Sequence, residues 1–516
     1  MSTFNELIDF TRSTTGTYLD SVVYGDELVT NGDFATDSDW TKTGNLTAIS
    51  NGTATIGETA GNGSIRQEDA LIAGKSYIVK FDITAVSSAS AFLAFRNDEF
   101  SSVGSAVISF GSSLSVATYS KVFVATGSIV NFTVGGGNSS LAIDNVSVKE
   151  VTGGQVSGTP LLRTAAINEP RLEYDASGNP LGLLIEEVRT NVVTYSEDFS
   201  QSYWLKQSVT VAPTSVAAPD GTTSAYEMDM ASNGMVRALT GYVPSVGQSY
   251  TASIWLKAGT ASTVKLSILF NGSGLGMVTE NLTLTNKWQR FDITSTVPSG
   301  TPDQVRYRII ASEAGSILVW GAQVETGAFP TSYIPTSGSN VARAADVASL
   351  PVERFAYNQS KGTVVAFQET FGTTGNLVPW EIHTGDTNRI VYNAKSSTAT
   401  IITGGSVQAS LNHADQLPSV FYKQGLAFKK DDIASSLDAS ILTDTSGTIP
   451  TVSSFKIGTD YSLLAMLNGH IKHIQYYPKR LSNTELQLLT QPSASPTMNL
   501  TFDGQATSTL VEGLHD

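Results

Sequence analysis

The sequence predicts an all-β protein of several domains, and three observations carry this prediction. Short segments rich in β-branched and aromatic residues, bounded by turn formers, recur along the 516 residues: Tyr77–Ile83, Val264–Phe270, Arg306–Ile310 and Gly362–Gln368. Asn-Gly pairs, which favour tight turns, begin at Asn31, Asn51, Asn62, Asn271 and Asn468. Helical periodicity is scarce. Its best candidate is Ser482–Leu489, where Ser482 is the expected N-cap and Glu485 completes a capping box.

Composition narrows the functional classes. Charged residues make up only 15% of the chain, against about 25% in a typical domain, so Ser, Thr, Asn and Gly supply the polar surface, as on the solvated faces of β-sandwiches. A net charge of −15 argues against binding to nucleic acid or to an anionic membrane surface. The chain has no cysteine, which excludes disulfides, thiolate zinc sites and thiol catalysis.

The N-terminal segment has neither the basic nor the apolar region of a signal peptide, and no stretch approaches the ~18–20 apolar residues of a membrane helix. We therefore expect synthesis in the cytoplasm and no membrane insertion.

An internal repeat organises the first two-thirds of the chain. NGDFATDSDW matches YSEDFSQSYW, so that Phe34 aligns with Phe199 and Trp40 with Trp204. Further matches follow in the same order: GKSYIVKFDI with GQSYTASIWL, ATYSKVFV with NKWQRFDI, and SLAIDNVSVKE with SILVWGAQVET. Four matching blocks predict two copies of one β-sandwich, with the shared aromatic residues in the core.

The third region has a different pattern. The strand-like Ser454–Gly458 is followed by an Asn-Gly turn at Asn468, an alternating segment that ends at Tyr477, and the capped helix.

Two resemblances follow from these motifs. The repeat unit, with NGDF and a following Trp at its start and IDNVSV at its end, resembles the carbohydrate-binding-module jelly roll. The closing segment Phe455–Leu486 resembles the laminin-G/concanavalin-A-like lectin sandwich. The expected domains are therefore a jelly roll over 29–150, a second jelly roll over 191–340 and a lectin-like sandwich over 341–492.

Three further motifs are similar to a family of phage structural proteins described as head-spike, head-fibre or tail-fibre proteins. They are LIDFTRSTTGTYLDS, LLRTAAINEPRLEYDASGNPLGLLIEEVRTN and VWGAQVETGAFPTSYIPTSGSNVARAADV. In that family the first two motifs lie close together, whereas here the first repeat separates them. The resemblance implies that 29–150 is inserted into an N-terminal element made of 1–28 and 151–190, which we expect to attach to the virion. We expect 493–516 to be a C-terminal arm that contacts another subunit.

Charged residues of the N-terminal element are expected to form structural ion pairs. The arginines are Arg12, Arg171 and Arg189, and the carboxylates are Asp9, Glu173, Asp175, Glu186 and Glu187.

No arrangement of residues predicts catalysis. The third region lacks the ExDxxE spacing of concanavalin-like hydrolases, and the paired carboxylates of a glycosidase are not apparent. The repeated turns of a β-helical depolymerase, a GxSxG elbow and a Walker loop are also missing. His470 and His473 lie three residues apart on one strand and are expected to face opposite sides, which makes a poor metal pair.

Calcium is the one metal that the resemblance implies, because carbohydrate-binding jelly rolls often hold a structural Ca²⁺ near their first and last strands. The candidate ligands are Asp33, Asp37, Asp39 and Asp144. Ala35 replaces an acidic residue that is frequent there, and Trp320 aligns with Asp144, so such a site belongs to the first module alone. The alternative is that these are solvated turn carboxylates. No cofactor is required.

Sugar binding needs an exposed aromatic ring beside planar polar side chains. The candidates are Phe95, Arg96 and Asn97 in the first module, and Trp380, His383 and Arg389 in the third. Each is alternatively a core or rim residue.

We therefore expect a virion protein of a tailed bacteriophage: a head or tail fibre or spike subunit that is assembled in the host cytoplasm and binds host surface polysaccharide without catalysis. Its expected partners are other capsid or tail proteins, and fibre analogy suggests a homotrimer. The alternatives are a purely structural decoration protein and a polysaccharide depolymerase.

Overall fold

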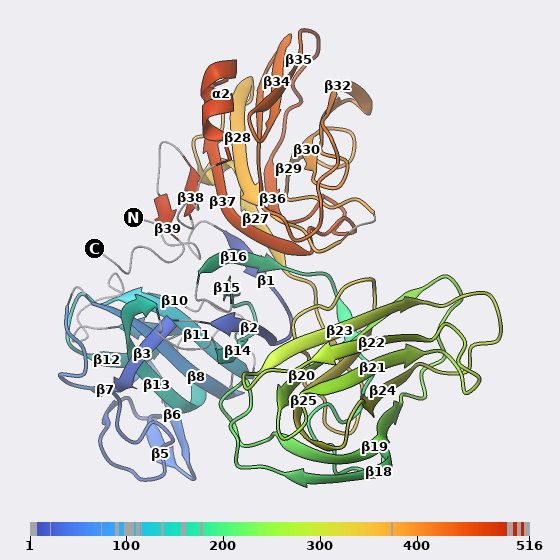
Figure 1. Cartoon of the computed structure of the whole chain (residues 1–516). Coiled ribbons are helices and arrows are strands. Elements are labelled where there is room, and N and C mark those ends of the chain that lie inside the picture. Colours follow the sequence, from blue (N-terminus) through green and yellow to red (C-terminus); the bar gives the residue numbers. More distant parts are fainter. Residues whose placement is uncertain are drawn as a thin grey trace. The chain divides into compact units, whose positions relative to one another are not determined.

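The computed structural model describes residues 8–20, 22–73, 75–87, 92–96, 108–109, 114, 116–135, 139–155, 161–175, 179–372, 375–492, 499–502 and 507–509. The chain forms two compact units. The first comprises residues 1–20, 160–164 and 170–510, and the second 21–159, 165–169 and 511–516. Strands dominate both units, so the all-β prediction is confirmed (Figure 1). No helix in the described part of the chain is long and apolar enough to cross a membrane.

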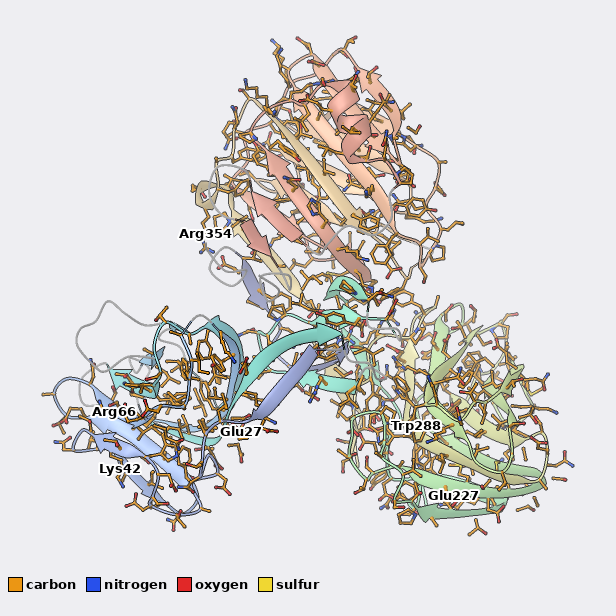
Figure 2. All side chains as sticks on the ribbon, turned by 60° about the vertical axis from the view of Figure 1, so that its left-hand side comes forward. Glu27, Lys42, Arg66, Glu227, Trp288 and Arg354 are labelled. Atoms are coloured by element: carbon orange, nitrogen blue, oxygen red, sulfur yellow. The ribbon has the colours of Figure 1, made fainter. Side chains whose placement is uncertain are left out.

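The second unit contains the first repeat (29–150), which we call the first module. This module is a sandwich of two sheets. One sheet has the order β10 (Ile108–Ser109), β9 (Phe92–Arg96), β12 (Val130–Gly135), β7 (Gly63–Gln67) and β4 (Thr41–Thr43). The other has the order β11 (Ala117–Val124), β8 (Ser76–Val86), β13 (Ser139–Gln155), β6 (Thr53–Glu58) and β5 (Ala48–Ser50), and β3 (Val22–Glu27) pairs with β13. Glu27, labelled in Figure 2, fixes the end of β3, because its carboxylate accepts hydrogen bonds from Ser147 and Val148 at 2.6 and 2.7 Å.

The second module is one continuous eight-stranded sheet folded around a single core. Its order is β22 (Val278–Thr283), β21 (Thr263–Leu269), β24 (Arg306–Ala311), β19 (Tyr226–Leu239), β25 (Gly315–Thr326), β20 (Ser249–Ala258) and β23 (Gln289–Thr296), and β18 (Trp204–Pro213) pairs with β19. The long strand β19 joins the two halves: its first five residues pair with β25 and its last five with β24. Between them Asn233 adopts a φ of 63°, which bends the strand.

The aligned aromatic pairs have the same role in both modules. Phe34 and Trp40 are buried with ring centroids 5.5 Å apart, and Phe199 and Trp204 are buried at 4.7 Å. Each indole nitrogen donates to the carbonyl oxygen nine residues earlier, at 3.0 Å for Trp40 and 2.9 Å for Trp204. A shared hydrogen bond at equal sequence spacing supports the interpretation of the two modules as copies of one unit, and their aromatic residues are core residues.

The third sandwich, whose strands are labelled in Figure 1, has a seven-stranded and a nine-stranded sheet. The seven-stranded order is β1 (Asp9–Thr11), β27 (Val347–Pro351), β36 (Ser454–Ile457), β29 (Trp380–His383), β30 (Arg389–Asn393), β31 (Thr398–Thr403) and β32 (Ser406–Asn412). The nine-stranded order is β15 (Leu172–Tyr174), β16 (Pro180–Ile185), β37 (Gly469–Tyr477), β28 (Lys361–Gln368), β33 (Tyr422–Lys429), β34 (Asp432–Leu437) and β35 (Ser440–Asp444), with β38 (Asn499–Phe502) and β39 (Thr507–Thr509) attached to β37.

Strand pairing connects the expected N-terminal element to the third sandwich. β1, β15 and β16 belong to the expected N-terminal element, yet they extend the two sheets of the third sandwich. Of the C-terminal segment, β38 pairs in parallel with β37 of the same chain.

The local predictions are mostly confirmed. The helix α2 (Asn483–Leu489) has Ser482 as its N-cap, with both hydrogen bonds of the capping box. Asn31, Asn51 and Asn468 adopt the left-handed conformation of a turn, but Asn62 and Asn271 do not.

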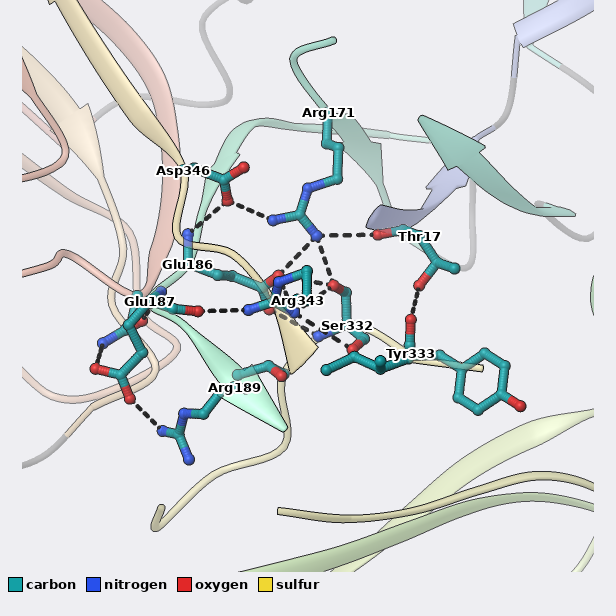
Figure 3. A network of polar contacts seen from close by, with 12 residues as sticks. Thr17, Arg171, Glu186, Glu187, Arg189, Ser332, Tyr333, Arg343 and Asp346 are labelled. Atoms are coloured by element: carbon teal, nitrogen blue, oxygen red, sulfur yellow. Dashed lines mark hydrogen bonds and ion pairs between the residues drawn. The ribbon is translucent and has the colours of Figure 1, made fainter. Parts of the chain in front are cut away.

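A buried ionic network, which we call the hub, ties distant parts of the first unit together (Figure 3). Arg171 contacts Glu186 at 2.7 Å and Asp346 at 2.5 Å, Arg343 contacts Glu186 at 2.9 Å, and Arg12 contacts Asp346 at 3.0 Å. All five side chains are at most 1% exposed. Burial alone would raise the pKa of Glu186, but Arg343, Arg171 and Ser332 hold it well below its ordinary value.

The hub is framed by two small sheets. One pairs β2 (Gly16–Asp20) with β14 (Leu161–Ala165), and the other pairs β17 (Arg189–Asn191) with β26 (Val341–Arg343). Because the hub side chains bond to one another, the network is structural, as the sequence suggested for Arg12 and Arg171. Arg189 lies outside the hub and forms an ion pair with Glu187, another member of the expected set, at 2.6 Å.

Candidate functional site

The first-module sugar candidates do not form a site. Phe95 is fully buried, and its ring packs edge-on against Phe123 and Phe132 at centroid distances of 4.8 and 5.2 Å. Its prediction as a stacking platform is therefore wrong, because period-two alternation turns it into the core. The side chain of Arg96 and the whole of Asn97 lie outside the described residues.

The expected calcium ligands are engaged with neighbouring groups. Asp33 accepts a hydrogen bond from the Ala35 amide, and Asp37 pairs with Lys42. Asp39 accepts from Ser38, and Asp144 accepts from the Asn145 amide. In the described part of the chain no three His, Asp or Glu side chains are grouped to hold a metal ion. The structure therefore gives no support to a calcium site at these carboxylates.

In the third sandwich the structure brings two of the three candidate residues together and buries the other. Trp380 is fully buried and its ring faces Phe455 in the core, at a centroid distance of 6.2 Å, so its prediction as an exposed platform is wrong. His383 and Arg389 are brought together, because they are directly paired residues of the neighbouring strands β29 and β30. Both are half-buried on the outward face of the seven-stranded sheet.

Two more residues complete what we call the Arg389 cluster: Glu381, His383, Arg389 and Tyr461. Glu381 lies two residues before His383 and so shares its face of β29. Tyr461 comes from the loop after β36; its amide donates to Glu381 at 3.2 Å, and its ring lies 5.3 Å from the Arg389 guanidinium and 6.1 Å from the His383 ring. Sequence reasoning missed Tyr461, which is far from β29 along the chain.

Glu381 is an unusual carboxylate. Its Oε2 lies 3.6 Å from Arg389 Nη1, but it accepts no hydrogen bond from the described residues. Burial raises the pKa of Glu381 to about 7, and Arg389 and the Tyr461 amide offset this only in part. The long contact with Arg389 explains why burial prevails over the ion pair.

The cluster offers unused hydrogen-bonding groups. His383 Nδ1 accepts from the Gly385 amide at 3.1 Å, and burial, with Lys456 and Arg389, lowers the pKa of His383 to about 4. The neutral ring therefore carries its proton on Nε2, which, like Arg389 Nε, has no partner among the described residues. Two N–H donors and one carboxyl oxygen of the cluster thus lack a hydrogen-bond partner within the described residues, and all three atoms are covered from solvent.

The loop that carries Tyr461 is held by Asp460. This carboxylate accepts hydrogen bonds from the Ser462 hydroxyl at 2.6 Å and from the Leu464 and Ala465 amides at 3.0 and 3.2 Å. Leu463 adopts a φ of 63°, and Leu464 is 88% exposed at the surface of the same loop. Asp460 therefore positions the loop over the cluster.

Comparison with known proteins identifies no family. No protein-family model and no curated protein matches the chain. The chain is similar to the enzymatically active domain of tailspike protein 4 of bacteriophage CBA120, with 15% identity, a TM-score of 0.23, and coverage of 27% of this chain and 21% of that chain.

Two further solved structures are matched over most of their own length. The CBM22-1–CBM22-2 tandem domain of Paenibacillus barcinonensis Xyn10C has 12% identity, a TM-score of 0.24, and coverage of 59% of this chain and 99% of that chain. Domains LG4-5 of the mouse laminin alpha1 chain have 9% identity, a TM-score of 0.19, and coverage of 52% and 92%. At such TM-scores these likenesses establish neither a family nor a function.

Proposed function

We propose that this protein is a non-catalytic glycan-binding component of a phage particle, a head or tail fibre or spike subunit whose third sandwich contacts host surface carbohydrate. The observation that carries the binding role is the Arg389 cluster. Sugar hydroxyls need hydrogen-bond partners at the surface, and the guanidinium of Arg389, whose side chain is 27% exposed, can donate to them. His383 Nε2, Arg389 Nε and Glu381 Oε2 also make no hydrogen bond within the described chain, but these three atoms are covered from solvent. The neighbouring Tyr461 ring supplies an apolar surface for a sugar face.

The assignment to a particle rests on sequence. The motifs around Arg12, Arg171 and Arg343 are similar to phage fibre and spike proteins, and in the structure these arginines form the hub. In these motifs, the three arginines therefore serve to hold the fold together. Assembly in the host cytoplasm, association with other virion proteins and trimerisation, which would multiply weak sugar sites, belong to the same proposal.

Catalysis is the second candidate, because Glu381 has a raised pKa and Asp460 lies close enough to raise it further. Two features argue against it. The Glu381 carboxyl is fully buried, and the Asp460 oxygens are already bonded within their own loop. A hydrolase needs one carboxyl that reaches the glycosidic oxygen and a second that is free to act as nucleophile or base.

The test uses the labelled full-length chain on a panel of bacterial cells before and after periodate oxidation of their surface glycans. We expect periodate-sensitive binding that Arg389→Ala and Tyr461→Ala both abolish, with no reducing ends released. Arg354→Ala is the matched control, since Arg354 is an exposed arginine of the same sandwich whose side chain is 41% exposed (Figure 2). Binding that survives periodate, or that Arg389→Ala leaves unchanged, contradicts the proposal, and release of reducing ends that Glu381→Gln abolishes supports the enzyme.

A further inference from the structure

A second group of side chains, which we call the aromatic–lysine cluster, lies on the outward face of the nine-stranded sheet. It consists of Phe367, Phe421, Lys423 and Lys472. Phe367 of β28 pairs directly with Lys423 of β33 on one side and with His473 of β37 on the other. Val364 and Ala366 of β28 are buried on the inward face, so Phe367 belongs to the opposite, solvent-facing side of the strand.

The two rings form a half-buried aromatic surface with cations above it. The Phe367 and Phe421 centroids are 5.1 Å apart with an interplanar angle of 45°. Lys423 Nζ lies 5.6 Å from the Phe367 centroid, and Lys472 Nζ lies 5.9 Å from Phe367 and 5.1 Å from Phe421. The neighbouring loop adds two exposed apolar side chains, Leu417 at 64% and Val420 at 41% exposure.

Lys472 is the unusual member of the cluster. It sits at a bulge of β37, where the pairing with β28 shifts between Ile471 and His473, and it is only 6% exposed. Within the described residues it forms no ion pair, and burial lowers the pKa of its amine. The two acids that act on it are held elsewhere: Glu369 bonds to His470 at 2.7 Å, and Asp175 bonds to Asn179 at 2.9 Å.

We propose that the aromatic–lysine cluster is a second glycan-binding site and that it takes a sugar bearing a carboxylate, such as a hexuronate or an ulosonate. The proposal rests on glycan binding as the proposed function but uses residues of the opposite sheet. A pyranose ring has an apolar C–H face that stacks on Phe367 and Phe421. A carboxylate on that ring reaches Lys472, where it replaces the hydration that the nearly buried ammonium has lost.

An acidic peptide satisfies only half of this arrangement. It would supply the carboxylate, but it has no flat apolar ring face held at a fixed distance from the charge. The geometry therefore favours a carboxylated sugar, and polyglutamate serves as the discriminating probe.

The experiment measures binding of the full-length chain to an array of bacterial oligosaccharides that contain hexuronates or ulosonates, each beside its carboxyl-reduced counterpart, with polyglutamate included. We expect salt-sensitive binding to carboxylated sugars, and at least about tenfold weaker binding to the reduced forms, as the loss of a charge-assisted hydrogen bond implies. Lys472→Met, which keeps the length of the aliphatic stem, and Phe421→Ala each lower this binding by a similar factor. Lys429→Met is the matched control, because it removes an exposed lysine of the same sheet, at the opposite end of β33 from Lys423.

The outcomes separate this inference from the proposed function. Arg389→Ala leaves the carboxylate-dependent binding unchanged, and Lys472→Met leaves the Arg389-dependent binding unchanged. The inference is overturned if no carboxylated sugar binds better than its reduced counterpart, if polyglutamate binds equally well, or if Lys472→Met binds like the wild type. Thermal unfolding of each variant confirms that the sandwich is intact.

Discussion

Replacing Arg171 by methionine tests whether the hub holds the first unit together. The guanidinium donates to the Thr17 carbonyl at 3.1 Å and to the Ser332 hydroxyl at 2.5 Å, and it pairs with Glu186 and Asp346. Methionine fills a similar volume but leaves both carboxylates buried with one partner fewer. Removing one partner of a buried ion pair costs about 3–5 kcal/mol, and here the cost falls on Glu186 and Asp346, which then keep Arg343 and Arg12, respectively, as ionic partners.

The assay must report each unit separately, since a two-unit chain need not unfold in one step. Hydrogen exchange followed by mass spectrometry over a urea series gives the free energy of unfolding for peptides of β16 and β27, which flank the hub, and for peptides of β8 in the other unit. We expect Arg171→Met to lower the first by about 3–5 kcal/mol and to leave the second unchanged. The control is Arg66→Met in the first module, which removes a partly exposed ion pair with Glu68, of the kind worth about 0–1 kcal/mol.

A second substitution tests whether Arg171 and Glu186 stabilise the hub through their mutual contact. Glu186→Gln and Arg171→Met each break the Arg171–Glu186 contact, which the double variant loses only once, so the two costs should not add in full. The reasoning is refuted if Arg171→Met costs no more than Arg66→Met, or if Glu186→Gln makes the Arg171 variant worse by its full single-variant effect.

Three further predictions concern protonation and capping. Glu173 and Glu369 raise the pKa of His470 to about 9 against its burial. Protonated His470 therefore adds about 3 kcal/mol to the free energy of unfolding below pH ~6.5, and this contribution is lost as the pH rises through 9. Urea unfolding of the first unit should show this decline in the wild type and not in His470→Gln. The pKa of Glu381 is raised to about 7, so ionisation of this carboxyl lowers the free energy of unfolding as the pH rises from 4.5 through 7. Glu381→Gln should therefore raise the free energy of unfolding by up to about 3 kcal/mol at pH 8 and by little at pH 4. An equal gain at both pH values would contradict this. Ser482→Ala should cost about 1 kcal/mol and speed hydrogen exchange within α2, whereas a helix that exchanges at the wild-type rate would show that the cap is not needed.

Features that depend on neighbouring residues could be predicted from the sequence. The prediction of helix α2 is correct because its capping box lies within four residues. The core positions of Trp40 and Trp204 followed from the repeat, since an aromatic residue at the same place in two copies points to packing. The ion pairs around Arg12 and Arg171 were also expected, although their shared partner Asp346 was not, because it comes from the far side of the second module.

The binding surfaces depended on information that the sequence does not carry locally. Both faces of β29 are covered: Trp380 and Ile382 lie in the core, and Glu381 lies beneath the loop that carries Tyr461. The sequence of β29 therefore does not identify the side chain that faces solvent. His383 and Arg389 lie close together in the sequence and are paired residues of neighbouring strands in the structure. Lys472 reaches Phe421 only because a bulge shifts β37 against β28, and a bulge of this kind has no reliable signature in a single sequence.

The ionic character of the hub explains how the chain accommodates the first module, a whole sandwich, in the connection between β2 and β14. Buried ion networks are weak stabilisers compared with apolar side chains of similar volume. What they add is geometric selectivity, since the planar fork of an arginine fits its carboxylates in few arrangements. Arg12, Arg171 and Arg343 come from three distant segments, so the network is complete only when all three segments are in register. Closing a longer connection costs only about 0.6 kcal/mol for each doubling of its length. A module inserted between β2 and β14 therefore adds little to the free energy of forming the hub, provided that these two strands still pair.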